Sequence, residues 1–170
     1  MRIRTLLDGD LPAAHALWAV TDHLGPIPAA EVAQLRAFEP ELVLGAHDDD
    51  GLVGVVLGSF DGRRGWINRL AVAERARRRG VARALVAELE HRLRERGCVQ
   101  VNLLVLDDNV AGRAFWSAAG YGDGWSLRMH AKRLDGTVRS GPPWVADLGE
   151  PAEADPTGGC GPADPATPAC

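Results

Sequence analysis

The side chains best suited to chemistry are gathered in one arginine-rich segment of the sequence. Residues 63–83 hold eight arginines and a single acid, Glu74, which gives this segment a formal charge of +7. Within it, the run Arg-Arg-Arg-Gly-Val-Ala at residues 77–82 joins an apolar, strand-like stretch to a helical pattern. The first amides of a helix lack backbone acceptors and carry partial positive charge. We therefore predict a cradle for a pyrophosphate group at this junction.

Two common nucleotide-binding patterns are missing from the sequence. It contains no Gly-x-x-x-x-Gly-Lys-[Ser/Thr] loop, and no Gly-x-Gly-x-x-Gly follows a predicted strand. An acyl-coenzyme A is the alternative ligand that an arginine-rich turn before a helix would suit. The plain interpretation of an arginine run is a solvated face. Gly80 and Ala82, in register at the helix start, favour the binding site.

Two sequence blocks resemble a known family. Arg77-x-x-Gly80-x-Ala82 matches the [Gln/Arg]-x-x-Gly-x-[Gly/Ala] loop of the GNAT N-acetyltransferase superfamily. Residues 109–121, Asn-Val-Ala-Gly-Arg-Ala-Phe-Trp-Ser-Ala-Ala-Gly-Tyr, resemble the later family motif at the expected distance. Together with the order of elements, the resemblance covers about residues 1–134. Shorter stretches at 59–65, 96–98 and 108–109 are similar to the bacterial YpeA-type branch.

This resemblance implies a fold and a reaction. The fold is α/β, the GNAT or acyl-CoA N-acyltransferase fold, with a mixed central sheet of about six to seven strands flanked by helices. The reaction is transfer of an acetyl group from acetyl-CoA to a primary amine by direct attack in a ternary complex. The partner is a small-molecule or peptide amine acceptor, and no metal is expected.

The resemblance also implies which residues bind coenzyme A. They are Leu70, Ala71, Val72, Arg77, Arg78, Arg79, Gly80, Val81, Ala82, Arg83, Asn109, Phe115 and Trp116. The strand backbone at 70–72 would pair with the pantetheine arm, and the amides of 78–82 would hold the pyrophosphate. Asn109 would bond the pantetheine, although Asn is also a common helix N-cap, and the two roles are compatible.

The same resemblance leaves the proton-transfer residues open. The backbone N–H of Val72 would stabilise the thioester oxygen. Trp116 stands where the family usually carries a tyrosine acid, and an indole N–H is a donor without usable acidity. Tyr121 is a possible replacement acid. Asp22 and His23, at the end of the first predicted helix, are the candidate bases.

Other polar residues are weaker candidates for the base. Asn68 lies where some relatives carry Glu, and an amide cannot accept the proton. His130, on the last predicted strand, remains possible. Asp107 and Asp108 are expected to cap the following helix.

The elements that would position these residues alternate between strands and helices. Helices are predicted at residues 10–23, 29–38, 80–96 and 109–119, and strands at 3–6, 42–46, 52–57, 66–72, 99–106 and 125–132. The order β-α-α-β-β-β-α-β-α-β is that of a mixed α/β sheet. The helix at 80–96 has the clearest apolar period. Asp10 is the expected N-cap of the helix at 10–23.

Composition divides the chain of 170 residues into two parts. Residues 1–135 carry 18 basic and 18 acidic side chains and are predicted to form the acetyltransferase domain. Residues 136–170 hold the whole net charge of −4 together with seven prolines and six glycines. We predict an acidic, mostly disordered C-terminal extension there. Three cysteines without a Cys-x-x-Cys spacing argue against disulfides or zinc, and Cys98 is expected to be buried.

Several classes of protein are excluded or disfavoured by these patterns. No run approaches the roughly 20 apolar residues of a membrane span, and the start resembles no secretory signal, so a cytoplasmic location is expected. One lysine, a neutral domain and an acidic tail disfavour nucleic-acid binding. A catalytically weak acyl-CoA sensor or interaction module is the alternative function, because of Trp116. The protein is expected to be a monomer or a homodimer.

Overall fold

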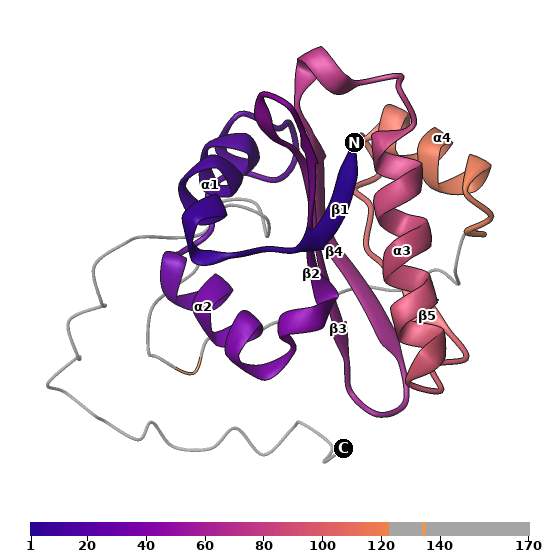
Figure 1. Ribbon diagram of the computed structural model, residues 1–170. Helices are drawn as coiled ribbons and strands as arrows, with labels where there is room; N and C mark the ends of the chain where they lie inside the picture. The colour runs from indigo at the N-terminus through magenta and orange to yellow at the C-terminus, as the bar shows by residue number, and fades with distance from the viewer. Residues whose placement is uncertain (123–133, 135–170) are drawn as a thin grey trace, which may run out of the picture.

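The computed structural model describes residues 1–122 and residue 134 (Figure 1). The strands are β1 (Arg2–Thr5), β2 (Val43–Asp48), β3 (Gly51–Phe60), β4 (Gly65–Val72) and β5 (Val101–Asn102). The helices are α1 (Leu11–Ala19), α2 (Ala29–Phe38), α3 (Val81–Glu95) and α4 (Val110–Ala118), with short 3-10 helices η1 (Asp8–Asp10), η2 (Pro40–Leu42) and η3 (Glu74–Ala76). The predicted strand at 125–132, His130, Cys160, Cys170 and the 136–170 extension lie outside the described residues.

The described part of the chain contains a five-stranded sheet in the order β1-β2-β3-β4-β5. The first three pairings are antiparallel, and β5 runs parallel to β4. The predicted order of elements is thus confirmed from β1 to α4, and the mixed sheet is confirmed with it. Helix α2 has the predicted bounds, and α3 differs from its prediction by one residue at each end.

Helices cover both faces of the sheet. Figure 1 shows α1 and α2 on one face and α3 and α4 on the other. From residue 54 to residue 58, successive positions of β3 alternate between two apolar clusters. Val55 and Leu57 face the cluster that holds Trp18 of α1, whereas Val56 faces the cluster built on Leu85, Leu89 and Leu93 of α3. The two clusters bury both sides of the central strands, as a three-layer α/β domain requires.

Glycines along the sheet let α3 pack unusually close to it. A Cβ atom on Gly54 would lie 2.9 Å from a methyl of Val81, and one on Gly58 would lie 2.5 Å from a methyl of Leu89. A Cβ atom on Gly65 would lie 2.9 Å from the sulfur of Cys98. These contacts follow the length of α3, so the helix is held at a fixed height above β3 and β4. Cys98 is buried there, as predicted.

Asp10 joins β1, β2 and the start of α1. Its carboxylate accepts hydrogen bonds from Arg4 at 2.6 and 3.0 Å, from the His47 ring at 2.9 Å and from the Leu7 amide at 2.8 Å. Asp10 occupies the N-cap position of α1, yet its side chain makes no capping bond. The carboxylate is directed at the strands instead, because Arg4 and His47 compete for it with full or partial charge.

Two predicted elements end earlier than expected. Helix α1 ends at Ala19 instead of about residue 23, and the Thr21 hydroxyl bonds back to the carbonyl oxygen of Leu17. His23 has a left-handed backbone, with φ of 64°, which no α-helix accommodates. Strand β5 is only Val101–Asn102 instead of residues 99–106, and it pairs with β4 at Gly65 and Trp66 alone.

Candidate functional site

A β-bulge in β4 places two successive polar side chains on the α1 face of the sheet. Leu57 of β3 pairs with Asn68, and Val55 pairs with Ala71, so β4 has one residue more than β3 between these pairs. Arg69 lies in this interval with φ of 51°. A bulge of this kind bends its strand and re-aims side chains. Here it turns Arg69 toward α1 and away from α3.

Beyond the bulge, one edge of β4 has no strand partner among the described residues. Strand β5 pairs with β4 only at Gly65 and Trp66. The amide of Ala73 donates to the Val53 carbonyl on β3 at 2.9 Å. Since successive amides of a strand point in opposite directions, the Val72 N–H is directed to the open edge. This is the edge along which the sequence predicted a pantetheine arm and the Val72 oxyanion donor.

The loop after β4 forms a concave set of backbone amides at the start of α3. Arg78 and Gly80 are left-handed, with φ of 61° and 81°, and α3 starts at Val81. Alternation of left- and right-handed residues turns consecutive N–H groups to one side, which is an anion-binding arrangement. Gly80 is the N-cap and has no side chain to satisfy the first amides of the helix. A Cβ atom at Gly80 would meet no atom within 4 Å, so the space above the helix start is open.

The eight arginines of residues 63–83 do not form a single patch. Arg63 and Arg64 lie in the turn at the other end of β4, about 25 Å from Val72 for a strand of this length. Arg69 is turned toward α1, and Arg75 is paired with Asp48 at 2.6 Å. The charge of +7 summed over residues 63–83 therefore does not describe one basic patch, because β4 separates the two ends of this segment.

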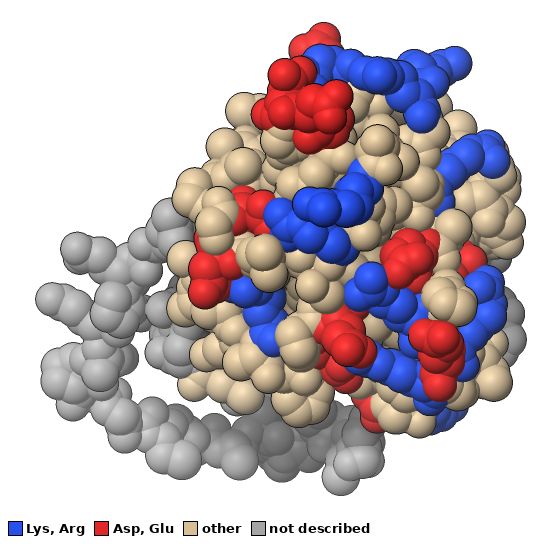
Figure 2. All heavy atoms as spheres, viewed as in Figure 1, with Lys and Arg blue, Asp and Glu red and all other residues tan. Residues whose placement is uncertain are grey.

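Four exposed arginines remain near the start of α3. They are Arg77, Arg78, Arg79 and Arg83. The Nε of Arg77 donates to the carbonyl oxygen of Val72 at 3.4 Å, so this side chain also ties the loop to the end of β4. Figure 2 shows basic side chains gathered at the end of the molecule where this loop lies, next to an acidic group. The local field there favours a ligand with several negative charges.

The α1–α2 loop, residues 20–28, brings His23 to the other side of the open edge. The Nδ1 of His23 lies 3.9 Å from a carboxylate oxygen of Asp108, which precedes α4. The side chain of His23 is 31% exposed, which leaves the ring open to an incoming group. Asp22, the other candidate base, is exposed next to it. Asp108 was expected only to cap α4, and its approach to His23 was missed because the two are 85 positions apart in the sequence.

Asn109 caps α4, as one of its two interpretations predicted. Its Oδ1 accepts a 2.8 Å hydrogen bond from the amide of Gly112. A Cβ atom on Gly112 would lie 2.6 to 2.8 Å from the Asn109 side chain, so glycine at 112 allows this close cap. The side-chain NH2 of Asn109 is not used by the cap. It stays available for the predicted bond to pantetheine.

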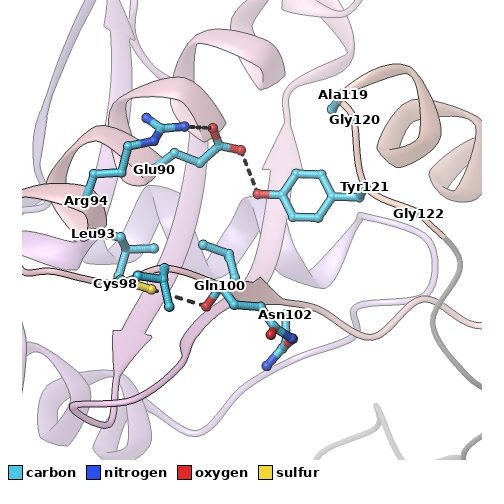
Figure 3. A pocket seen from close by; sticks show the side chains of 12 residues that line it. Glu90, Leu93, Arg94, Cys98, Gln100, Asn102, Ala119, Gly120, Tyr121 and Gly122 are labelled. Carbon is cyan, nitrogen blue, oxygen red and sulfur yellow. Dashed lines mark hydrogen bonds and ion pairs between the residues drawn. The ribbon is translucent and has the colours of Figure 1, made fainter.

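Trp116 and Tyr121 belong to one aromatic group at the end of α4. The Trp116 ring lies edge-to-face with Phe115 at 5.0 Å and with Tyr121 at 5.1 Å between centroids. The Tyr121 hydroxyl donates to Glu90 of α3 at 2.7 Å (Figure 3). Burial and the Glu90 carboxylate raise the pKa of Tyr121 well above its usual value. A hydroxyl held in this way is a poor proton donor, which counts against Tyr121 as the replacement acid.

A cavity of about 510 Å³ lies around Tyr121, Glu90 and Cys98. Figure 3 shows the side chains that line it. It lies near the C-terminal end of α3, whereas the phosphate loop lies at the N-terminal end of that helix. One side of it is formed by residues up to Gly122, the last of the continuous described stretch. The cavity is therefore separate from the open edge of β4.

Left-handed backbone conformations occur in the three segments that carry the candidate site residues. The non-glycine residues with left-handed φ in residues 1–122 are His23, Arg69 and Arg78. They belong to the α1–α2 loop, the β4 bulge and the phosphate loop. Such conformations cost of order 1–3 kcal/mol each and are concentrated at functional sites.

We find no set of three or more potential metal ligands within the described residues. None of the described helices has the length and apolar character needed to cross a membrane.

Comparison with known proteins agrees with this geometry. The model of the acetyltransferase (GNAT) family matches residues 13–121. An acetyltransferase of Pectobacterium atrosepticum is 37% identical over 113 residues, which are 65% of this chain and 80% of that protein. An acetyltransferase of Sodalis glossinidius is 34% identical over 136 residues, 79% of this chain and 96% of its own length. The chain therefore belongs to the GNAT acetyltransferase family, as its two sequence motifs predicted.

The fold has a close counterpart among solved structures. The crystal structure of Ard1 from Thermoplasma volcanium superimposes with a TM-score of 0.65 and 28% identity, over 70% of this chain and 80% of that one. The GNAT fold predicted from the sequence is thereby confirmed.

Proposed function

We propose that this protein transfers an acetyl group from acetyl-CoA to a primary amine by direct attack in a ternary complex. The observation that carries the proposal is the edge of β4 that has no strand partner beyond Trp66 within residues 1–122 and that leads into the start of α3. The edge offers strand-like hydrogen bonds to an amide-containing arm, and the loop offers amides and positive charge to a pyrophosphate. One cosubstrate carries both groups in the right order, coenzyme A.

The proposed reaction needs two proton transfers. The amine nitrogen bonds to the thioester carbon, the carbon–sulfur bond breaks, and its electron pair leaves on sulfur. The amine loses a proton, and the thiolate gains one. The Val72 N–H is directed at the edge where the thioester oxygen would collect negative charge. Its contribution is electrostatic and needs no proton exchange.

His23 is the better of the two proposed bases. Its ring nitrogen faces Asp108, and a carboxylate at one ring nitrogen orients an imidazole for proton transfer at the other. Asp22 has no comparable partner among the hydrogen bonds and ion pairs of the described residues. Trp116 cannot protonate the leaving thiolate, because an indole N–H has no usable acidity. We propose that solvent protonates the thiolate, which is a tolerable leaving group since thiols titrate near 8.5.

The second candidate function is an acyl-CoA-binding sensor with weak catalysis. The packing of Trp116 between Phe115 and Tyr121 favours it, since no phenol is directed at the open edge there. Turnover separates the two functions. Thiol release from acetyl-CoA with a panel of lysine, spermidine, kanamycin and a peptide with a free N-terminus supports the enzyme. No release above hydrolysis with any amine, together with retained coenzyme A binding, supports the sensor.

Coenzyme A binding itself is tested by calorimetric titration of Gly80→Glu. The new carboxylate would stand at the start of α3 and repel a pyrophosphate by about 1–4 kcal/mol, so we expect affinity at least tenfold weaker. Gly97→Glu is the matched control, because Gly97 has φ of 79° and lies just beyond the other end of α3. Equal affinities in the two variants would contradict the proposed site.

We also propose that residues 1–135 form the catalytic domain and that residues 136–170 are an acidic, mostly disordered extension outside it. A chain truncated after residue 135 should then retain the coenzyme A affinity of the full chain.

A further inference from the structure

Arg69 and Trp18 hold each other through two different contacts. The indole N–H of Trp18, a fully buried residue, donates to the carbonyl oxygen of Arg69 at 3.0 Å. The Arg69 guanidinium carbon lies 5.6 Å from the Trp18 ring centroid, within the range of a cation–π contact. Helix α1 and the β4 bulge are thus joined by a backbone bond and by a stacked side chain.

The same guanidinium binds the α1–α2 loop. Its Nη2 donates to the carbonyl oxygen of Leu24 at 3.0 Å and to that of Gly25. These carbonyls follow His23, and both His23 and Gly25 are left-handed, so the loop lacks the hydrogen bonds of a regular helix. Within the loop, the Leu24 amide makes one turn bond, to Thr21 at 3.2 Å. The guanidinium therefore restrains residues 23–25 together with the packing of Leu24 and Ile27 against the apolar cluster that holds Trp18.

Partial burial of the charged Arg69 side chain costs free energy, and packing alone does not explain why a charged residue stands at this position. Burial lowers the pKa of Arg69, which means that the charged form is partly desolvated. The Nε of Arg69 is buried without an acceptor, and no carboxylate pairs with this side chain in the described part of the chain. Replacement of a buried charge by an apolar residue of similar volume is often neutral or stabilising. The planar guanidinium can stack on Trp18 while its Nη2 donates to both loop carbonyls, a combination that neither an apolar side chain nor an ammonium group provides.

We infer that Arg69 is a positioning residue for the amine acceptor, because it fixes the loop that carries His23 against β4. The inference rests on the proposed function, in which His23 takes the proton of the amine. Movement of the Leu24 and Gly25 carbonyls would carry His23 away from Asp108 and from the open edge of β4. The coenzyme A side would be unaffected, since the phosphate loop is tied to Val72 and Asp48 instead.

Arg69→Lys tests this inference, because it keeps the charge and loses the planar guanidinium and its stacking on Trp18. We expect kcat/KM for whichever panel amine supports turnover to fall about ten- to a hundredfold, the loss expected when a reacting group is misplaced by about 1 Å. The coenzyme A affinity, measured by calorimetric titration, should stay within about twofold. Trp18→Phe keeps the aromatic ring and removes only the indole N–H, so kcat/KM for the amine should fall less.

The matched control is Arg96→Lys. Arg96 binds Glu39 at 2.7 Å and Glu41 at 3.1 Å at the far end of α3, so the same exchange costs a forked interaction away from the site. We expect it to lower stability and to leave kcat/KM for the amine unchanged. A parallel loss of coenzyme A affinity in Arg69→Lys, or a kcat/KM for the amine that does not change, would overturn the positioning role.

Amide hydrogen exchange gives a readout that does not depend on turnover. In Arg69→Lys, we expect exchange to accelerate in residues 20–25 and to stay unchanged in α3. Unchanged exchange in residues 20–25 would overturn the inference even if the protein acetylates amines. Faster exchange confined to that loop, with no acetylation of any amine by the wild type, would support the restraint and contradict the proposed function instead.

Discussion

The hydroxyl of Tyr121 donates to the carboxylate of Glu90 on α3, 2.7 Å away, while the Tyr121 ring packs edge-to-face against Trp116. The only tyrosine of the sequence is thus engaged in joining α4 to α3. Tyr121 is therefore a poor candidate for the acid that protonates the thiolate. Whether the protein can supply such an acid is best tested by a substitution at position 116.

Trp116→Tyr should raise kcat if thiolate protonation limits turnover. A positioned acid contributes about 100- to 10,000-fold in favourable cases, so an increase of at least tenfold is expected. Coenzyme A affinity should change less than twofold. The measurement is thiol release with the best amine of the panel. Trp116→Phe is the control, because it removes the indole without adding a hydroxyl; a rise in that variant would show that bulk, not acidity, was limiting.

His23→Gln should lower kcat/KM for the amine by about 100-fold through loss of the base. Asp22→Asn, at the neighbouring exposed position, should leave kcat/KM unchanged. The opposite pattern would assign the base to Asp22, and an unchanged kcat/KM in both variants would remove the two candidates together.

Asn109 has two roles that substitutions can separate. Asn109→Asp keeps the Oδ acceptor that binds the Gly112 amide and removes the NH2 donor. Stability should be retained while coenzyme A affinity falls several-fold. Asn109→Ala should lose both, with a destabilisation of about 1 kcal/mol from the missing cap. Chemical denaturation and calorimetric titration measure the two effects, and full affinity in Asn109→Asp would leave Asn109 with the cap alone.

Gly58→Ala should destabilise the protein by about 1–3 kcal/mol through overpacking. The added methyl would lie 2.5 Å from Leu89 and 3.0 Å from the Leu42 carbonyl oxygen, and both neighbours are in the packed interior. Gly9→Ala is the control, because a methyl there meets no atom within 4 Å. Urea denaturation measures both. An unchanged midpoint in Gly58→Ala would show that α3 can shift away from the sheet.

Asp10 should make stability depend on acid. Burial alone would raise its pKa, but hydrogen bonds from Arg4, Leu7 and His47 outweigh burial and hold the pKa well below the usual range. A lowered pKa in the folded state gives stability that is present above the unfolded-state pKa of about 3.9 and is lost as the pH falls below it.

Asp10→Asn should accordingly cost about 2 kcal/mol at pH 7, since the bonds to Arg4 are charge-assisted. The difference from the wild type should shrink as the pH falls below about 4. Thermal denaturation between pH 3 and pH 7 measures this, with Asp49→Asn as an exposed control. A constant difference over that range would contradict the assignment.

The sequence was sufficient for elements whose pattern is local. The periodic apolar residues of α3 and the glycines at its two ends gave its bounds to within one residue, and α2 was bounded by Pro28 and Pro40. The first family motif placed a strand–helix junction at residues 77–82, and α3 does begin there, at Val81. Such a junction depends on a few adjacent residues and is therefore visible in the local sequence. The binding of a phosphate at this junction stays a prediction.

Features that depend on contacts between distant segments were not predicted. Arg69 was counted among the phosphate arginines, and only the β4 bulge reveals that it faces α1. The consecutive polar pair Asn68-Arg69 inside an apolar strand was the available signal, since it interrupts the alternation of β4. The approach of His23 to Asp108 had no local signal, because α1 had to end four residues early for it to form.

The close packing of α3 on Gly54, Gly58 and Gly65 has an evolutionary consequence. The packed interior fixes the position of α3, at whose start coenzyme A is proposed to bind, whereas the α1–α2 loop is held by Arg69 and by the packing of Leu24 and Ile27. Residues 20–28 can therefore diverge in length and composition without disturbing the phosphate loop. A chain of this design can acquire new acceptors while its donor chemistry stays constant.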